Sequence, residues 1–282
     1  MPRTDRPVAT GTTVRALVTN DDGIASAGIR ALAGAALAAG LEVVVAAPAG
    51  EASGSSAALT AVQADGRIVV EQHRLEGVED VPAYGVAATP AFIVRIATRG
   101  AFGPAPDVVL SGINRGANTG RSILHSGTVG AALTARTRGL PGMAVSLAGA
   151  DPEHWETAAG VAGEVLRHLL AAGEPLVLNL NVPDLPSRQL RGLRRARLAP
   201  FGRVQTTITD IGRGYVQLGV AAEEDPEHEP DTDAALVAAG FATVTALHPI
   251  CERGDVELPG ISRPGDEQRS AAPHQDSVEA AP

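Results

Sequence analysis

Three short polar segments of the 282-residue chain could carry chemistry, and each follows an apolar run. The first is Asn20-Asp21-Asp22-Gly23, directly after the apolar run Val14–Thr19. Two adjacent carboxylates at the end of a buried strand are costly unless a positive charge partners them. Neighbours in a strand point to opposite faces, but Gly23 allows a turn that lets both carboxylates reach one ion. We therefore favour a metal site over the alternative that one Asp simply caps a helix.

The other two segments offer neutral oxygen atoms. Ser53-Gly54-Ser55-Ser56 follows the apolar run Leu41–Ala47, and a hydroxyl there could bind a cation or a phosphate oxygen. Such a Ser/Gly segment taken alone is usually a plain loop. The third segment, SGINRGANTG at 111–120, contains Asn114 and Asn118, and Asn side-chain carbonyls suit hard cations.

The residues after the third segment have the composition of an anion site. Ser126, Gly127 and Thr128 open an expected helix, so backbone N–H groups and two hydroxyls could hold a phosphate. Simple helix capping is the alternative for Ser126 or Thr128 taken alone.

Carboxylate, hydroxyl and amide oxygens together suit Mg²⁺ or Mn²⁺ rather than copper or an iron–sulfur cluster. A cation beside a phosphate site indicates hydrolysis of a phosphate ester. The metal would lower the pKa of a bound water and neutralise oxygen charge in the transition state. Attack on phosphorus by Asp21 itself is the less favoured variant.

Composition and missing motifs exclude several other classes. All 23 basic residues are Arg, which excludes a Walker A loop and Schiff-base chemistry. There is no GxSxG, GxGxxG or close His pair, and Cys251 is the only cysteine. A phosphatase with an Asp nucleophile would want a second carboxylate two positions on, where Gly23 stands after Asp21.

Charge and hydropathy limit which partners the protein could bind and where in the cell we expect it. The net charge of -9 is concentrated in 221–233 and 252–282, so the remainder has no basic stripe for a nucleic acid polymer. No apolar run of about 18 residues predicts a membrane span. The first residues contain no apolar leader, so we expect a cytoplasmic protein.

The elements that must position these residues alternate between strand and helix, which predicts a three-layer α/β fold with a Rossmann-like sheet. Polar segments at the carboxyl ends of its strands would meet at the edge where such sheets bind ligands. We expect strands at 14–19, 41–47, 68–70, 81–86, 107–110, 143–147 and 176–180, and helices at 28–39, 90–99, 127–138 and 153–171.

The pattern changes after residue 185. Two β segments at 204–209 and 215–221 with a turn at 212–214 predict a hairpin, followed by a helix at 232–239 and a strand at 242–247. The expected organisation is a disordered leader (1–12), a Rossmann-like catalytic domain (13–185), a hairpin and oligomerisation region (186–250) and a disordered tail (251–282).

At these residues the sequence resembles the SurE family of 5'/3'-nucleotidases. The resemblance spans roughly residues 14 to 250, and its most specific motifs are NDDGI, SGIN and SGTVGAA in that order. It implies one divalent metal ion per subunit, held by Asp21, Asp22, Ser53 and Asn114. It places Asn118, Ser126, Gly127 and Thr128 on the phosphate side.

The resemblance also implies hydrolysis of nucleoside 5'- and 3'-monophosphates, short polyphosphate as a substrate of some members, and a homodimer or homotetramer. The chain departs from the family pattern at two loops. Ala49-Gly50-Glu51-Ala52 replaces a charged run, and Ala88–Ile93 replaces a GTPTDC segment. His125 stands where the family usually has Tyr.

Two further hypotheses come from other classes. A non-catalytic nucleotide-binding protein would keep the fold and lose turnover through the altered loops. An oxidoreductase would need the glycine fingerprint that the chain lacks.

Overall fold

In the computed structural model of the chain, residues 13–200, 204–212, 215–222 and 229–249 are described. The first half of the described chain contains β1 (Arg15–Thr19), α1 (Ala27–Ala38), β2 (Glu42–Pro48), β3 (Gln63–Ala64), β4 (Arg67–Ile68), β5 (Val70–His73), β6 (Ala83–Val86), α2 (Pro90–Ala97), β7 (Val108–Arg115), the 3₁₀ helix η1 (Gly120–His125) and α3 (Gly127–Arg136). The second half contains β8 (Gly142–Ala148), α4 (Trp155–Ala171), β9 (Val177–Pro183), the 3₁₀ helix η2 (Ser187–Gln189), β10 (Leu193–Arg195), β11 (Val204–Gly212), β12 (Tyr215–Ala222), α5 (Asp233–Ala238) and β13 (Ala242–Leu247).

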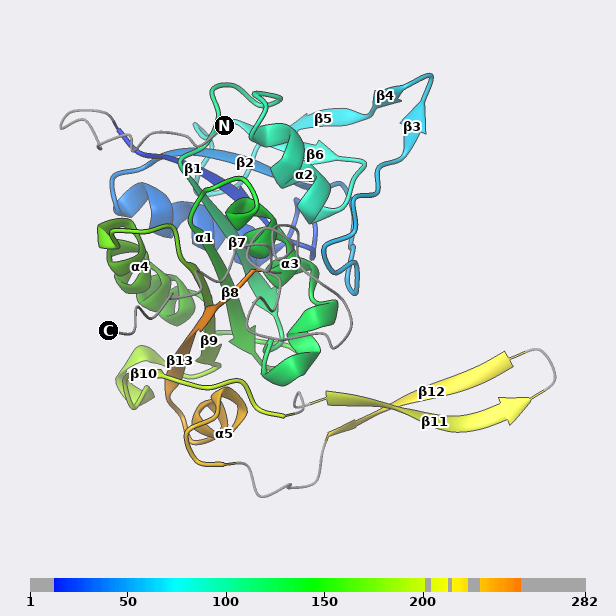
Figure 1. Ribbon diagram of the computed structural model, residues 1–282, viewed down its shortest axis with the longest axis vertical. Coiled ribbons are helices and arrows are strands. Elements are labelled where there is room, and N and C mark those ends of the chain that lie inside the picture. The colour runs from blue at the N-terminus through cyan, green and yellow to red at the C-terminus, as the bar shows by residue number, and fades with distance from the viewer. Residues whose placement is uncertain (1–12, 201–203, 213–214, 223–228, 250–282) are drawn as a thin grey trace, which may run out of the picture. The chain divides into compact units, whose positions relative to one another are not determined.

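Within the described residues, nine strands form one sheet in the order β10-β13-β9-β8-β7-β1-β2-β6-β5 (Figure 1). Strand β1 lies between β2 and β7 and is parallel to both. The chain passes from β1 to β2 and β6 on one side, then returns to β7, β8 and β9 on the other. The β1/β7 pair is therefore the switch point at which open α/β sheets bind ligands.

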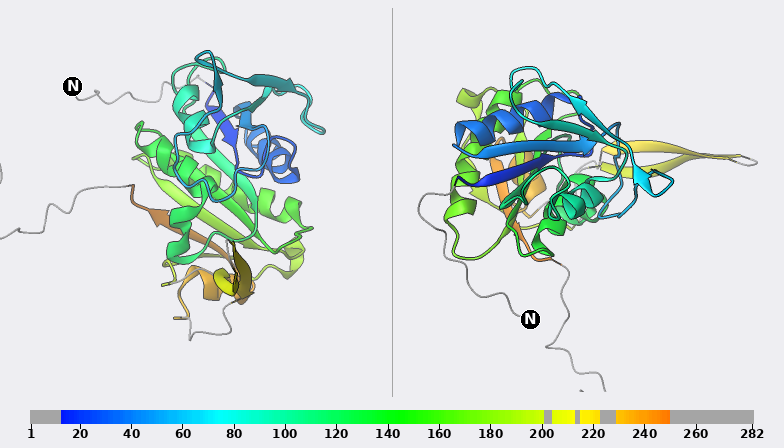
Figure 2. Two further views of the ribbon diagram at one scale, coloured as in Figure 1. Left: turned by 90° about the vertical axis from the view of Figure 1, so that its right-hand side faces the viewer. Right: turned by 90° about the horizontal axis from the view of Figure 1, so that it is seen from above.

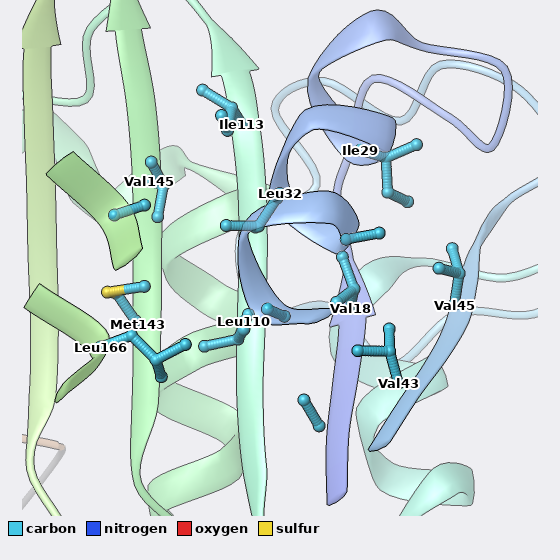
Figure 3. Packing of buried hydrophobic residues seen from close by; sticks show 14 of the residues in the cluster. Val18, Ile29, Leu32, Val43, Val45, Leu110, Ile113, Met143, Val145 and Leu166 are labelled. Atoms are coloured by element: carbon cyan, nitrogen blue, oxygen red, sulfur yellow. The ribbon is translucent and has the colours of Figure 1, made fainter. Parts of the chain in front are cut away.

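Helices cover both faces of the sheet, so the predicted three-layer α/β fold is confirmed (Figure 2). Alternate residues of β1 face different layers, because successive strand side chains point to opposite sides. Val18 packs in the cluster that includes α1 and α4, whereas Leu17 packs with α2 and α3. Figure 3 shows the first cluster, with Ile29 and Leu32 of α1 over the strands.

Strand β7 is longer than the expected strand at 107–110, so Asn114 lies in a strand and not in a loop. Pairing with β8 continues to Arg115, with a shift in register between Ser111 and Asn114. Gly112 makes this path possible, since its φ is +136° and a side chain there would begin 2.3 Å from the Val145 carbonyl oxygen. The Gly-rich sequence looks like a loop because the partner strand that holds it is distant in the chain.

Two other expectations need correction. The expected strand at 68–70 is divided at Val69, because Arg67–Ile68 pairs with β3 and Val70–His73 pairs with β6. Residues 120–125, expected as loop, form η1. The other expected strands and helices are present with ends shifted by a few residues.

Strands β11 and β12 form the expected antiparallel hairpin, and β11 runs on to Gly212. Residues 213–214 of the expected turn, the leader 1–12 and the tail 251–282 lie outside the described residues. The domain boundary at residue 185 stays a prediction, and β10 and β13 from beyond it join the main sheet. No helix in the described ranges is long and apolar enough to cross a membrane.

Candidate functional site

The turn after β1 is held by the side chain of Asn20, which is completely buried. Its amide nitrogen donates to the Gly23 carbonyl (3.0 Å) and to the Ser26 hydroxyl (2.7 Å), and its carbonyl accepts from the Gly23 N–H (3.2 Å). Gly23 has the positive φ of +96° that the sequence led us to expect. The turn therefore fixes the backbone on which Asp21 and Asp22 stand.

Asp21 lies against the N-terminus of α3. Its side-chain oxygen Oδ1 accepts a hydrogen bond from the Thr128 hydroxyl. Burial raises the pKa of Asp21, and the hydroxyl and the backbone N–H groups of Thr128 and Gly127 partly offset that rise. The N-terminus of α3, which was expected to hold a phosphate, thus lies against the carboxylate of Asp21.

Asp22 is half-buried beside the end of β7. Its Oδ2 accepts a hydrogen bond from the Arg115 N–H at 3.1 Å. Burial raises the pKa of Asp22 to about 6, and the neighbouring charge of Asp21 adds to the rise while the Arg115 N–H opposes it. The two carboxylates thus lie together at a place where burial raises their pKa by more than their hydrogen bonds lower it.

Asn114 presents an oxygen atom to the same corner. Its amide nitrogen donates to the carbonyls of Arg115 (3.2 Å) and Gly116 (2.8 Å), which fixes the orientation of the amide. Its Oδ1 lies 3.4 Å from the Thr128 hydroxyl that binds Asp21. We call Asp21, Asp22, Asn114 and Thr128 the cation corner. The described residues contain no group of three or more His, Cys, Asp and Glu placed to hold a metal, so neutral oxygens would have to complete any cation site here.

The Ser/Gly loop contacts the corner through residues other than Ser53. The Ala52 N–H donates to the Asp21 carbonyl at 2.7 Å, whereas the exposed Ser53 hydroxyl donates to Glu51 at 2.8 Å. Ser55 Oγ is buried, and no group among the described residues forms a hydrogen bond with it. A side chain on Gly127 would begin 2.6 Å from Ser55 Oγ and 2.7 Å from Asp21 Oδ2, so α3 can lie this close to both oxygens only because residue 127 has no side chain.

Ser126 caps α3, which was the alternative to phosphate binding for this residue. Its hydroxyl accepts a hydrogen bond from the Val129 N–H at 3.1 Å. His125, the preceding residue, is exposed.

Asn118 belongs to a second polar cluster, at the ends of β8 and β9. Asn181 contacts both backbone groups of Asn118, since it accepts from the N–H and donates to the carbonyl, each at 2.8 Å. Asn179 donates to the same carbonyl (2.9 Å), and the Asn118 amide donates to the Ser146 hydroxyl (2.9 Å). We call Asn118, Ser146, Asn179 and Asn181 the amide network. It holds the loop that follows Asn114.

Four residues in or beside these clusters were not singled out from the sequence, namely Ser55, Ser146, Asn179 and Asn181. Ser55 lies in a segment that was recognised, but Ser53 was chosen there. Asn179 and Asn181 alternate with leucines in an otherwise apolar strand, and two buried amides on one strand face were a usable signal.

Comparisons with known proteins point to one family. The family model described as Survival protein SurE matches residues 16–204. A 5'-nucleotidase SurE of Stenotrophomonas maltophilia is 39% identical over 241 residues, covering 83% of this chain and 89% of that protein. A 5'/3'-nucleotidase SurE of Cronobacter sakazakii is 39% identical over 249 residues, covering 83% and 90%. The crystal structure of the SurE protein from Aquifex aeolicus matches with a TM-score of 0.69 at 31% identity, covering 86% of this chain and 96% of that one.

Proposed function

This chain belongs to the SurE family, and from that premise we propose that it is a 5'-nucleotidase, which hydrolyses nucleoside monophosphates to nucleoside and phosphate. Relatives named 5'-nucleotidase and 5'/3'-nucleotidase support the activity. The observation that carries the proposal in this chain is the cation corner, which lies at the switch point of the sheet.

We propose that one Mg²⁺ or Mn²⁺ binds to Asp21, Asp22 and Asn114, and that Ser53 becomes a ligand when its hydroxyl turns away from Glu51. The donor chemistry fits a hard cation, because the set offers carboxylate, amide and hydroxyl oxygens and no soft ligand. The burial that raises the pKa of both aspartates is the kind of cost that a divalent charge would offset. When bound, the ion would activate water and neutralise charge on the phosphoryl oxygens.

The remaining residues orient these groups. Thr128 fixes one oxygen of Asp21, and the absence of a side chain at Gly127 lets α3 approach Asp21 and Ser55 closely. We propose that the phosphoryl group binds beside the cation corner, near the N-terminus of α3, which Ser126 caps. We propose that Asn118, in the loop that the amide network holds, contributes to the phosphate side of the site.

Water rather than Asp21 is the nucleophile in this proposal. Asp21 is buried, and its Oδ1 accepts a hydrogen bond from Thr128. A carboxylate fixed in this way suits a metal ligand better than a nucleophile. A bond forms between the water oxygen and phosphorus, and the bond from phosphorus to the nucleoside oxygen breaks. The attacking water gives up one proton and the nucleoside oxygen gains one, so that the products are phosphate and the nucleoside.

We further propose that the protein is a cytoplasmic homodimer or homotetramer. Four of the seven exposed large apolar side chains among the described residues lie in one stretch of the chain and support the association: Leu59 (48% exposed), Val62 (70%), Val69 (54%) and Val70 (44%).

Phosphate release from AMP with Mg²⁺ or Mn²⁺, with and without EDTA, tests the function. We expect release that EDTA abolishes and that either cation restores. Binding of AMP without release of phosphate from any nucleoside monophosphate, across metals, would instead show a non-catalytic nucleotide-binding protein.

A further inference from the structure

A cleft of about 360 Å³ opens beside the cation corner. Asp22 forms part of its wall, and the rest comes mainly from Glu51, Arg115, Asp151, Pro152 and Trp155. Its volume lies in the range of small-molecule sites, which run from about 300 to 1,000 Å³. A substrate whose phosphoryl group binds at the cation corner therefore has an adjoining cleft, lined in part by Asp22, with room for its leaving group.

Trp155, the only tryptophan of the chain, is the aromatic residue in this wall. It begins α4 and is half-buried. Its ring fits against α1 because Gly28 has no side chain, as a Cβ there would lie 2.9 Å from Trp155 Cζ3. The indole is thus held in place before any ligand arrives.

The chain leading into Trp155 is anchored as well. Asp184 accepts hydrogen bonds from the backbone N–H groups of Glu153 (3.1 Å) and His154 (2.8 Å). It also accepts one from the His154 ring nitrogen Nδ1 at 2.8 Å. A rigid aromatic face loses little entropy when a flat ring stacks on it.

The charges of the cleft are predominantly negative. Glu51 and Asp151 are exposed carboxylates, Asp22 adds a third, and Arg115 is the one cation among the lining residues. A leaving group that carries another phosphate would meet two carboxylates beyond those of the cation corner. An uncharged sugar and base would not be repelled.

We propose that this cleft binds the nucleoside half of the substrate, with the base stacked on Trp155, and that Glu51 and Asp151 disfavour leaving groups that bear a further phosphate. The inference rests on the proposed nucleotidase function and specifies its substrate class. The chain should prefer nucleoside monophosphates to inorganic polyphosphates and to phosphomonoesters without a base.

Fluorescence of the single tryptophan tests the stacking directly in the unaltered protein. Adenosine should change the emission of Trp155 in a saturable way, and ribose at the same concentrations should not. An emission spectrum that adenosine leaves unchanged would overturn the proposal, whatever the activity of the protein.

Kinetics of a Trp155→Leu variant separate base binding from phosphate chemistry. Stacking of one base is worth about 1–3 kcal/mol, so KM for AMP should rise on the order of tenfold. The kcat/KM for glycerol 2-phosphate, which has no base, should stay within about twofold, and Trp155→Phe should lie between Leu and the wild type for AMP. Equal losses on both substrates would indicate a structural role and overturn the proposal.

The acidic residues are tested by Asp151→Asn, with Glu164→Gln, an exposed acid on α4 outside the cleft lining, as a control of equal charge. The ratio of kcat/KM for tripolyphosphate to that for AMP should rise about threefold in Asp151→Asn and stay constant in Glu164→Gln. An unchanged ratio in Asp151→Asn would overturn the charge selection. A wild-type protein that hydrolyses none of these substrates would refute the nucleotidase function itself, and the fluorescence result would still judge the cleft.

Discussion

The cation corner and the amide network lie at the carboxyl ends of neighbouring strands, and both bury polar groups, but their polar groups are satisfied in different ways. In the amide network, neutral side chains form hydrogen bonds with backbone groups. Asn181 accepts from the N–H of Asn118 and donates to its carbonyl. Asn179 Oδ1 is the exception, as it has no hydrogen-bond partner within the described part of the chain. In the cation corner, two carboxylates lie side by side and an orphaned Ser55 hydroxyl lies near them.

This difference separates a structural polar cluster from a binding site. A buried network whose groups satisfy one another stabilises the fold and needs no ligand. Buried carboxylates whose pKa is raised by burial are stable as anions only when a positive charge approaches them. We therefore expect substitutions of Ser146, Asn179 and Asn181 in the network to change stability, and substitutions in the corner to change activity and the response to cations.

The largest effect should follow Asp22→Asn. Loss of a charged ligand removes several kcal/mol of transition-state stabilisation, so kcat/KM for AMP should fall about 100-fold or more. The metal-free variant should melt no lower than the wild type, because a charge that burial disfavours has been removed. Steady-state kinetics and thermal melting check both, with Asp80→Asn at an exposed site as the control. Full activity in Asp22→Asn would contradict the assignment.

Asn181→Leu should show the opposite behaviour. The half-buried Asn118 N–H loses the one side-chain partner that the described residues give it, and an unsatisfied donor away from water costs about 1–3 kcal/mol. The free energy of unfolding in urea should fall by that amount with and without Mg²⁺. Asn179→Leu is the matched variant, and it should cost less because the Asn118 carbonyl keeps its bond from Asn181. Equal costs would show that the contacts of Asn181 do not hold the loop.

Thr128→Val tests the one residue that joins Asp21 to Asn114. The substitution keeps the side-chain shape and removes a hydrogen bond to a charged group, so kcat/KM for AMP should drop about tenfold. Thr128→Ser, which keeps the hydroxyl, should retain most of the activity. If Val performs as well as Ser, the hydroxyl does not position Asp21.

The smallest effect concerns pH. Folding raises the pKa of Asp22 from 3.8 to about 6, so this group favours the folded state at low pH, and its contribution is lost as pH rises through about 6. In EDTA, the Tm of the wild type relative to Asp22→Asn should therefore fall between about pH 4 and pH 7. Saturating Mg²⁺ should remove or reverse that fall. A difference that does not depend on pH would mean that Asp22 is not desolvated.

The sequence predicts the layers and the location of the site well, because both depend on local patterns. Apolar runs such as Leu41–Ala47 end at Gly or Pro, and polar segments after parallel strands must meet at one edge. The pairing of Asn118 with Asn181 was not predictable in this way. It joins residues that are 63 positions apart and depends on β8 lying beside β9.

The same reason explains the errors near the site. Residues 111–115 are rich in Gly and polar residues and look like a loop, yet β8 holds them as a strand. The position of Trp155 in its cleft also depends on a distant contact, between Gly28 of α1 and Trp155 of α4. No local sequence pattern indicates that contact.

Crystals grown with Mn²⁺ and measured for anomalous scattering provide the most direct test of the central claim. We predict one peak per subunit, contacted by carboxylate oxygens of Asp21 and Asp22, by Asn114 Oδ1 and by Ser53 Oγ. A peak elsewhere, or one that binds the aspartates while Asn114 and Ser53 stay out of contact, would contradict the account.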